Sequence, residues 1–326
     1  MSKRAGITAL GAYAPPTILS NEDLERMMDT SDEWIRTRTG IRQRHVSAED
    51  EFSSTLAFRA VDDLVERHGR AAIDDVDAVI VATNTPDALF PATAALVQDH
   101  FGLTAGAFDV LTACSGWLYA LSIARAYVES GMRRKVLTVG AEALTKLVDW
   151  EDRSTAVLFG DGAGAAVVEA VDSPYGFKSF VLGADGAGGK FLNIGAVAPH
   201  LPDGTPLGKK VYQNGAEVFK FAVRIMQSAS LEAIEGACMQ PSDISLFVPH
   251  QANLRIIKAA RERLELPPER VVVTVDEYGN NSTASIPLAL KHALDGGRIA
   301  AGDNLLLVAF GGGLTWASTV LTWGGA

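Results

Sequence analysis

Cys114 is the residue whose type and position best suit covalent chemistry. It lies in the segment 108–117, between an apolar run typical of a strand and a segment with apolar residues at helical spacing. At the start of a helix, unpaired backbone N–H groups and the helix dipole stabilise a thiolate. The position therefore predicts a nucleophile. A buried, inert cysteine that packs as a small hydrophobic residue is the alternative, and this segment alone leaves both open.

The elements that must position this cysteine follow from the pattern of apolar residues. Continuous apolar runs alternate with amphipathic helical segments. Such runs are typical of strands covered on both faces, so the pattern predicts a layered α/β protein. The clearest runs are Asp77–Ala82, Lys135–Gly140, Ile244–Pro249 and Asn304–Phe310.

The apolar runs recur at a nearly constant spacing. Residues 75–81 resemble residues 243–249 at an offset of 168 positions, and residues 136–140 resemble residues 306–310 at an offset of 170. The likeness lies in patterning rather than identity. It indicates duplication of one set of strands and helices. The predicted halves are residues 1–172 and 173–326.

The duplication brings distant polar residues together. Under the offset, the helix that begins near Cys114 pairs with the helix that begins near Asn280. The strand that ends at Ala82 pairs with the strand that ends at His250. If the halves pack about a pseudo-twofold axis, Cys114, His250 and Asn280 meet where α/β proteins place their sites, at the carboxyl ends of strands.

Composition excludes several classes of protein. The two cysteines, Cys114 and Cys238, cannot form a disulfide framework or a cysteine-rich zinc site. A formal net charge of −10 disfavours nucleic acid as a partner. No apolar run approaches the roughly 20 residues that cross a bilayer, and residues 5–14 are typical of a first strand rather than an export signal. We therefore expect a cytoplasmic protein with neither nucleic acid nor membrane as partner.

Six segments resemble, in order, the motifs of β-ketoacyl-acyl-carrier-protein synthase III, the condensing enzyme family that starts bacterial fatty-acid synthesis. The resemblance spans essentially the whole chain. It implies an α/β, duplicated thiolase-like fold of five layers (αβαβα), with two mixed sheets around central helices, and a homodimer. It also implies acyl-CoA and malonyl-acyl carrier protein as substrates, with no metal and no other cofactor. The segments are residues 30–41, 109–117, 159–165, 248–255, 278–287 and 310–316.

The resemblance assigns the catalytic roles. Cys114 accepts an acyl group from a thioester, and His250 and Asn280 donate hydrogen bonds to the enolate oxygen formed when a malonyl thioester loses CO2. The backbone N–H groups of Cys114 and Gly312 form a second oxyanion hole. By themselves, a histidine at a strand end, a Gly-Asn-Asn turn and a glycine loop have structural explanations. The motifs in which these residues lie favour catalytic roles over purely structural ones.

The same resemblance assigns contacts to coenzyme A. Trp34, Arg38 and Arg153 surround the adenine and phosphates, and Phe219 and Asn253 line the pantetheine tunnel. Guanidinium groups suit phosphate and aromatic rings. Without the motif, surface packing and solvated charge would explain Trp34 and Arg38.

The acyl pocket and the carrier-protein dock are also predicted. Trp117, Leu144 and Phe90 border the pocket, and Phe90 reaches across the dimer. Acyl carrier proteins are acidic, so an acidic chain needs a local basic patch to bind one. Glu262 and Glu265 interrupt the predicted patch, which leaves an ordinary solvated helix as the alternative. The predicted carrier-binding residues are Gln251, Ala252, Asn253, Leu254, Arg255 and Lys258, with Arg261, Lys209, Lys210 and Lys220 nearby.

Gly160–Gly164 is rich in glycine but is predicted to form a hairpin turn rather than a phosphate-binding loop. It lacks the Gly-Lys-Ser/Thr ending of such loops. The apolar residues that follow are typical of a strand.

Rival functions of the same fold fit less well. A thiolase needs a second cysteine in the C-terminal glycine loop, where this chain has Phe310 and Gly311, and elongating synthases have a second histidine in place of Asn280. A polyketide or alkylquinolone-type starter synthase remains the enzymatic alternative. A non-catalytic partner subunit would be expected to lose Cys114. The sequence leaves the acyl primer open.

Overall fold

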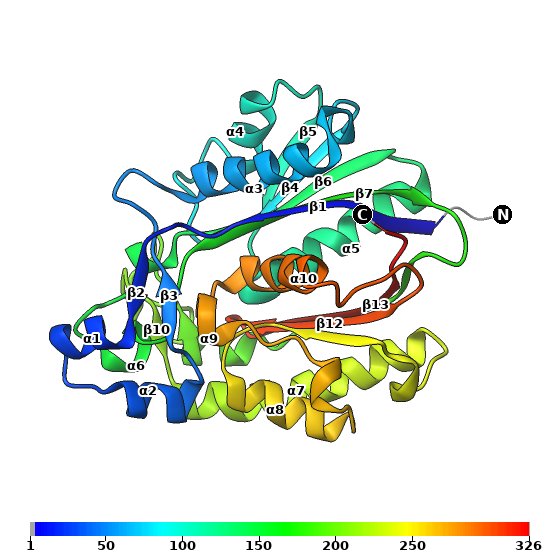
Figure 1. The fold of residues 1–326 in the computed structure, drawn as a ribbon. Coiled ribbons are helices and arrows are strands. Elements are labelled where there is room, and N and C mark those ends of the chain that lie inside the picture. The colour runs from blue at the N-terminus through cyan, green and yellow to red at the C-terminus, as the bar shows by residue number, and fades with distance from the viewer. Residues whose placement is uncertain (1–3, 326) are drawn as a thin grey trace.

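Two mixed β-sheets form the framework of the molecule (Figure 1). The computed structural model describes residues 4–325. In spatial order, the first sheet contains β1 (Arg4–Tyr13), β7 (Gly162–Val171), β6 (Lys135–Glu142), β4 (Ala78–Ala82) and β5 (Gly106–Val110). The second contains β8 (Gly176–Ala184), β13 (Thr315–Thr322), β12 (Asn304–Gly311) and β11 (Leu246–Pro249).

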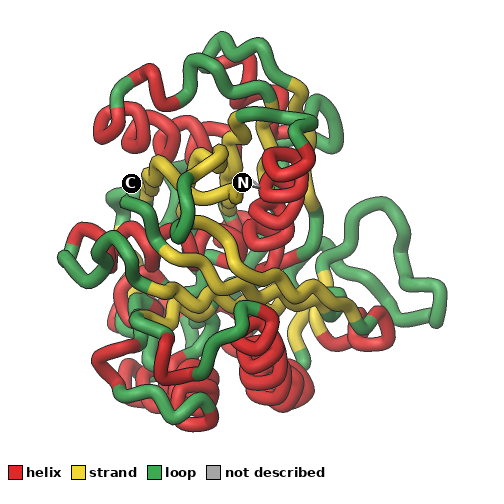
Figure 2. The backbone as a smooth tube through the Cα atoms, turned by 90° about the vertical axis from the view of Figure 1, so that its right-hand side faces the viewer, coloured by secondary structure: helices red, strands yellow, loops and turns green. Residues whose placement is uncertain are grey.

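Helices cover both faces of each sheet. The central layer consists of α5 (Gly116–Ser130) and α10 (Ser285–Asp295), which lie between the sheets. On the outer face of the first sheet lie α3 (Ser53–His68) and α4 (Thr93–His100), and beneath the second lie α7 (Gly215–Gly236) and α8 (Leu254–Arg263). Figure 2 shows the strands as the inner framework and helices on its outer sides. The predicted five-layer αβαβα fold is confirmed.

The two sheets repeat one topology. From β1 to β4, neighbouring strands pair antiparallel, antiparallel and then parallel. From β8 to β11 the sequence of pairings is the same. Only β5 lacks a counterpart among the described strands. The apolar runs predicted as strands correspond to β4, β6, β11 and β12, with ends that differ by one or two residues.

Three buried clusters match the layers. One lies between the sheets around α5 and α10 and includes Trp117 and Leu290. The second lies beneath α3 and includes Leu56. The third lies beneath α7 and α8 and includes Phe221 and Ile257. Burial on both faces explains why the strands are continuously apolar.

The hairpin turn predicted at Gly160–Gly164 is wrong for its second half. Gly162 and Gly164 lie within β7, which follows β6 only after a long connection. The reason for glycine is packing rather than turning, because a Cβ at Gly164 would collide with Pro287 of the central helix α10.

The remaining elements gather at one end of the sheets, on the left in Figure 1. The elements at this end are β2 (Ile18–Ser20), α1 (Asn21–Met27), α2 (Asp32–Thr39), β3 (Gln43–His45), α6 (Arg153–Ala156), β9 (Leu192–Asn193), β10 (Tyr212–Gln213) and α9 (Val275–Tyr278). The fold as a whole also contains short 3₁₀ helices, at Arg70–Ala72, Leu144–Lys146, Gly186–Phe191, Pro241–Asp243 and Pro268–Arg270.

Within residues 4–325, no helix combines the length and apolar character needed to cross a bilayer.

We expect Gly164→Ala to lower the free energy of unfolding by about 2 kcal/mol, because the added methyl group overpacks the contact between β7 and α10. Urea denaturation followed by circular dichroism measures the change. Gly215→Ala is the matched control, since no atom lies within 4 Å of the position its Cβ would take and alanine is favoured in a helix. Equal stability of the two variants would contradict this packing.

Candidate active site

Cys114 lies in a strained turn at the start of a central helix. The turn is a 3₁₀ helix, η2 (Ala113–Ser115), that leads directly into α5. Ala113 has a φ of +46°, a left-handed conformation that is unfavourable for residues other than glycine. The turn packs against β12 of the second sheet, where a Cβ at Gly311 would collide with the backbone nitrogen of Cys114. Glycine at this position therefore permits the close approach.

A matching turn begins the other central helix. The 3₁₀ helix η7 (Ser282–Ala284) leads into α10, and Ser282 has a φ of +47°. This turn packs on β6 of the first sheet, where a Cβ at Gly140 would lie 2.5 Å from the carbonyl oxygen of Thr283. Each central helix thus begins against the sheet of the opposite half.

His250 follows directly after β11. Its backbone N–H donates to Val308 O at 2.8 Å, and its ring packs edge-on against Phe310. The Nδ1 atom lies 2.6 Å from Ser285 Oγ at the start of α10, and no protein partner among the described residues bonds Nε2. Burial lowers the pKa of the imidazole to about 3, so the ring is neutral near pH 7.

Asn280 is held in place by backbone pairing. Its N–H donates to Leu158 O at 2.9 Å, and its carbonyl oxygen accepts from Gly160 N–H at 3.1 Å. The side-chain Oδ1 accepts from Ser282 N–H at 2.9 Å. This bond orients the carboxamide and leaves the Nδ2 donor without a hydrogen-bond partner among the described residues.

The surroundings of Cys114 keep its sulfur protonated. Burial raises the pKa of the thiol to about 12, the Ser282 hydroxyl opposes this rise, and the Glu142 carboxylate adds to it. Loss of solvent around the sulfur therefore opposes the thiolate that the helix start is predicted to stabilise. Acyl transfer to this sulfur requires that its proton leave.

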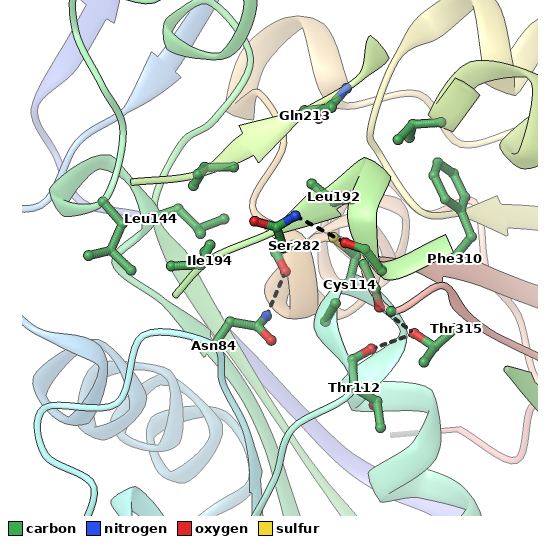
Figure 3. A pocket seen from close by; sticks show the side chains of 18 of the residues that line it. Asn84, Thr112, Cys114, Leu144, Leu192, Ile194, Gln213, Ser282, Phe310 and Thr315 are labelled. Atoms are coloured by element: carbon green, nitrogen blue, oxygen red, sulfur yellow. Dashed lines mark hydrogen bonds between the residues drawn. The ribbon is translucent and has the colours of Figure 1, made fainter. Parts of the chain in front are cut away.

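One cavity joins these groups. It has a volume of 1110 Å³ and is lined by Cys114, His250, Asn280 and Gly312. Figure 3 shows Cys114 between Phe310 and Thr315 on one side and Leu144 and Ile194 on the other. The turn between β12 and β13 contributes Gly312 and Gly313 to this lining. A thiol, an imidazole and an amide therefore face a single space.

The residues predicted to bind coenzyme A fall into two groups. Phe219 and Asn253 line the cavity. Arg38 and Arg153 lie over the ring of Trp34, with guanidinium carbons 4.9 and 4.8 Å from its centroid. Asn253 Nδ2 donates to Arg38 O at 3.0 Å, which connects this cluster to the cavity. The structure thus brings all five residues to one side of the site.

The predicted border of the acyl pocket needs correction. Leu144 lines the cavity, but Trp117 does not, since α5 directs it into the core between the sheets, where it is 1% exposed. Phe90 is 85% exposed and lies outside the cavity lining of its own chain, whereas its neighbour Leu89 is part of that lining. The cavity of its own chain therefore does not explain the predicted contact of Phe90 with substrate.

The predicted carrier-binding segment is only partly accessible. Gln251 was assigned wrongly, because it is buried and bonded at both ends to backbone groups, among them Thr274 N–H at 2.8 Å and Pro249 O at 2.7 Å. The other predicted residues are accessible to different degrees. Ala252 lines the cavity, Asn253 caps α8, Leu254 packs against Gly40, and Arg255 and Lys258 are exposed.

The basic stripe on α8 begins at the mouth of the cavity. The guanidinium of Arg255 lies 5.1 Å from the ring centroid of Phe219, which lines the cavity. Arg261, further along, pairs with Glu262 at 3.0 Å. Lys209 lines the cavity, whereas Lys220 pairs with Glu217. Arg255 and Lys209 thus lie at the cavity without an ion pair among the residues that the structure describes.

Sequence reasoning missed several polar residues of the site. Asn84 and Ser282 line the cavity, and Glu142 and Ser285 lie directly behind it. Glu142 carried a signal, because an acidic residue at the end of a continuously apolar strand is unusual. The described residues contain no group of three or more histidine, cysteine or acidic side chains placed to hold a metal ion.

Comparisons with known proteins agree with this arrangement. The model of 3-oxoacyl-[acyl-carrier-protein] synthase III matches residues 108–186, and the model of its C-terminal part matches residues 234–323. A β-ketoacyl-[acyl-carrier-protein] synthase III of Deinococcus deserti is 53% identical, covering 98% of this chain and 92% of that protein.

Solved structures give the same result. That of β-ketoacyl-[acyl-carrier-protein] synthase III from Thermus thermophilus is 67% identical with a TM-score of 0.97, covering 98% of this chain and 100% of that one. The priming β-ketosynthase of the R1128 polyketide pathway is 36% identical with a TM-score of 0.90, covering 100% and 98%.

We expect His250 to remain neutral between pH 5 and 8, because burial lowers its pKa to about 3. Nitrogen–proton correlation spectra of the ring, assigned with His250→Asn, test this. A signal that titrates within that range would contradict the closed environment. Ser285→Ala should change the ratio of the two neutral tautomers, since Ser285 is the partner of Nδ1.

Proposed function

The chain belongs to the 3-oxoacyl-[acyl-carrier-protein] synthase III family of acyl-transferring condensing enzymes, and on that premise we propose that it condenses an acyl-CoA primer with malonyl-acyl carrier protein. The products are 3-oxoacyl-acyl carrier protein, CoA and CO2, and the reaction initiates fatty-acid synthesis. The observation that carries the proposal is that Cys114, His250 and Asn280 face one cavity.

Acyl transfer comes first. The sulfur of Cys114 attacks the thioester carbonyl, the bond from that carbon to the sulfur of CoA breaks, and the proton of the Cys114 thiol ends on the departing CoA. The oxyanion formed on the way accepts hydrogen bonds from the backbone N–H groups of Cys114 and Gly312. Gly311 supports this step, since it lets the glycine loop approach the cysteine backbone.

Decarboxylation and condensation follow. The malonyl thioester loses CO2, and the enolate oxygen accepts hydrogen bonds from His250 Nε2 and Asn280 Nδ2. The contact between Ser285 and Nδ1 supports this role, because a hydroxyl that donates to Nδ1 leaves the proton on Nε2. The carbanion then attacks the acyl carbon, and the Cys114 thiolate leaves. Its high pKa means that it takes up a proton from solvent.

Thiolysis is disfavoured by the position of the second cysteine. Cys238 is exposed beyond the end of α7 and is not among the residues that line the cavity. A second thiol is therefore not available to act beside Cys114. A polyketide-starter synthase would share the chemistry proposed here and differ in primer and pathway.

The proposal includes binding sites and assembly. CoA binds along Phe219 and Asn253 with its adenine at Trp34, Arg38 and Arg153, and malonyl-acyl carrier protein docks at the exposed cations of α8. We further propose a cytoplasmic homodimer, supported by the exposed apolar side chains of Leu89, Phe90 and Leu111 beside the cavity. The division into halves at residues 172 and 173 is likewise our proposal. No other cofactor is needed for these steps.

Replacing either enolate donor should impair decarboxylation more than acyl transfer. We expect His250→Ala and Asn280→Ala to slow CO2 release from malonyl-acyl carrier protein about 100-fold, while transfer of acetyl from CoA to Cys114 falls by less than about tenfold. Single-turnover assays measure each half-reaction. His292→Ala, outside the cavity lining, is the control. An equal loss of rate in both half-reactions would contradict the proposal that His250 and Asn280 act mainly in decarboxylation.

Reversing charge on α8 should weaken binding of the carrier. We expect Arg255→Glu combined with Lys258→Glu to raise the KM for malonyl-acyl carrier protein about tenfold, because both cations are exposed near the mouth and the carrier is acidic. The KM for malonyl-CoA should change much less. Arg263→Glu, on the same helix, is the matched control. An identical change for both substrates would contradict this dock.

A further inference from the structure

Glu142 is a buried carboxylate beside the active site that the proposed mechanism does not use. It ends β6 and has no exposed surface. A buried charge is costly unless it is paired or fully hydrogen bonded. The hydrogen-bond donors to Glu142 are all neutral, so hydrogen bonds rather than an ion pair stabilise its carboxylate.

Donors reach Glu142 from both halves of the chain. From the first half, Asn84 donates from its backbone N–H at 3.2 Å and from its side chain, and Thr85 Oγ1 donates at 3.0 Å. From the second half, Thr283 Oγ1 donates at 3.1 Å from within the turn η7. The carboxylate therefore ties the end of the first sheet to the turn that begins α10.

The same donors continue to the reacting groups. Asn84 Nδ2 also donates to Ser282 Oγ at 3.1 Å (Figure 3). The Ser282 hydroxyl lowers the pKa of the Cys114 thiol, which lines the same cavity, and Ser282 N–H donates to Asn280 Oδ1 at 2.9 Å. A continuous chain of contacts thus runs from Glu142 through Asn84 and Ser282 to the nucleophile and to the enolate donor.

We propose that Glu142 is a positioning residue: through Asn84 it sets the Ser282 hydroxyl against the sulfur of Cys114, and through Thr283 it fixes the turn that orients Asn280. The inference rests on the proposed function for its role in condensation. Its test is made on the free protein and reads the thiol alone, so it succeeds or fails independently of condensing activity.

Electrostatics makes this role measurable. Burial raises the pKa of Glu142 to about 7, with its hydrogen bonds opposing the rise, and its negative charge raises the pKa of Cys114. Of the other titratable groups that line the cavity, His250 stays neutral at these pH values, and Lys190, Asp203 and Lys209 are not among the groups that shift the pKa of Cys114. The neighbours of Glu142 on the remaining elements, Thr85 and Thr283, carry no charge. Ionisation of Glu142 near pH 7 must therefore suppress the thiolate.

The experiment measures alkylation of Cys114 by iodoacetamide between pH 6 and 9.5, followed on the Cys114 peptide by mass spectrometry. This separates it from the exposed Cys238. We expect the logarithm of the rate to rise with pH, flatten around pH 7 as Glu142 ionises, and rise again. Glu142→Gln should give a straight line with a rate at pH 8 about tenfold above that of the unmodified protein.

Two further variants test the chain of contacts. Ser282→Ala and Asn84→Ala remove or release the hydroxyl that lowers the pKa of Cys114, so both should slow alkylation by about tenfold, opposite in sign to Glu142→Gln. Alanine is tolerated at the φ of Ser282, because Ala113 adopts the same conformation in the matching turn. A substitution that only changed the access of iodoacetamide to the cavity would not remove the flattening of the rate near pH 7.

Asp161→Asn is the matched control. Asp161 is likewise a buried carboxylate, held by Ser47 and Thr145, but it does not act on the thiol. It should lower stability and keep the flattening. A straight line for the unmodified protein, flattening retained in Glu142→Gln, or an unchanged rate in Asn84→Ala would each overturn the proposal. Glu142→Asp withdraws the charge by one methylene group and should reduce the flattening; an unchanged amplitude would also contradict it.

Discussion

The geometry of the site depends on one reciprocal packing constraint. The turn that contains Cys114 lies against Gly311 in the second sheet, and the turn that contains Ser282 lies against Gly140 in the first. Both turns hold a non-glycine residue at positive φ, so tertiary packing must supply the energy that keeps them. The first turn of each central helix packs against the sheet of the opposite half. Strand ends and helix starts from both halves therefore meet at one cavity.

The three groups at the centre of the site carry no charge at rest, and one buried carboxylate, Glu142, lies beside them. The thiol, the imidazole and the carboxamide are all neutral near pH 7. Such a site holds donors in fixed orientations before charge develops, so little reorganisation accompanies enolate formation. Hydrogen bonds made by Ser285 and Ser282 supply that orientation for His250 and Asn280. The charge on Glu142 is separated from the cavity by neutral donors.

The sequence predicted most of the fold and the three residues that we propose to react, but not their surroundings. Periodicity and the offset between halves predicted the layered duplication, and motif resemblance predicted the family, which the comparisons confirm. The burial that opposes a thiolate at Cys114 is a property of the assembled halves, so no local pattern indicated it. The helical spacing of apolar residues does not show which of them face the core, so it could not predict that Trp117 does. The motif around His250 likewise could not show that Gln251 is buried and hydrogen bonded to backbone groups. Glu142 contacts residues distant in sequence, so no local pattern linked it to the site.

The central claim is that Cys114 carries the acyl group, and intact-protein mass spectrometry after mixing with acetyl-CoA alone tests it most directly. The account predicts one added acetyl group, located on the Cys114 peptide, and no adduct after Cys114→Ala. An adduct on Cys238, or none on Cys114 while condensation proceeds, would contradict it.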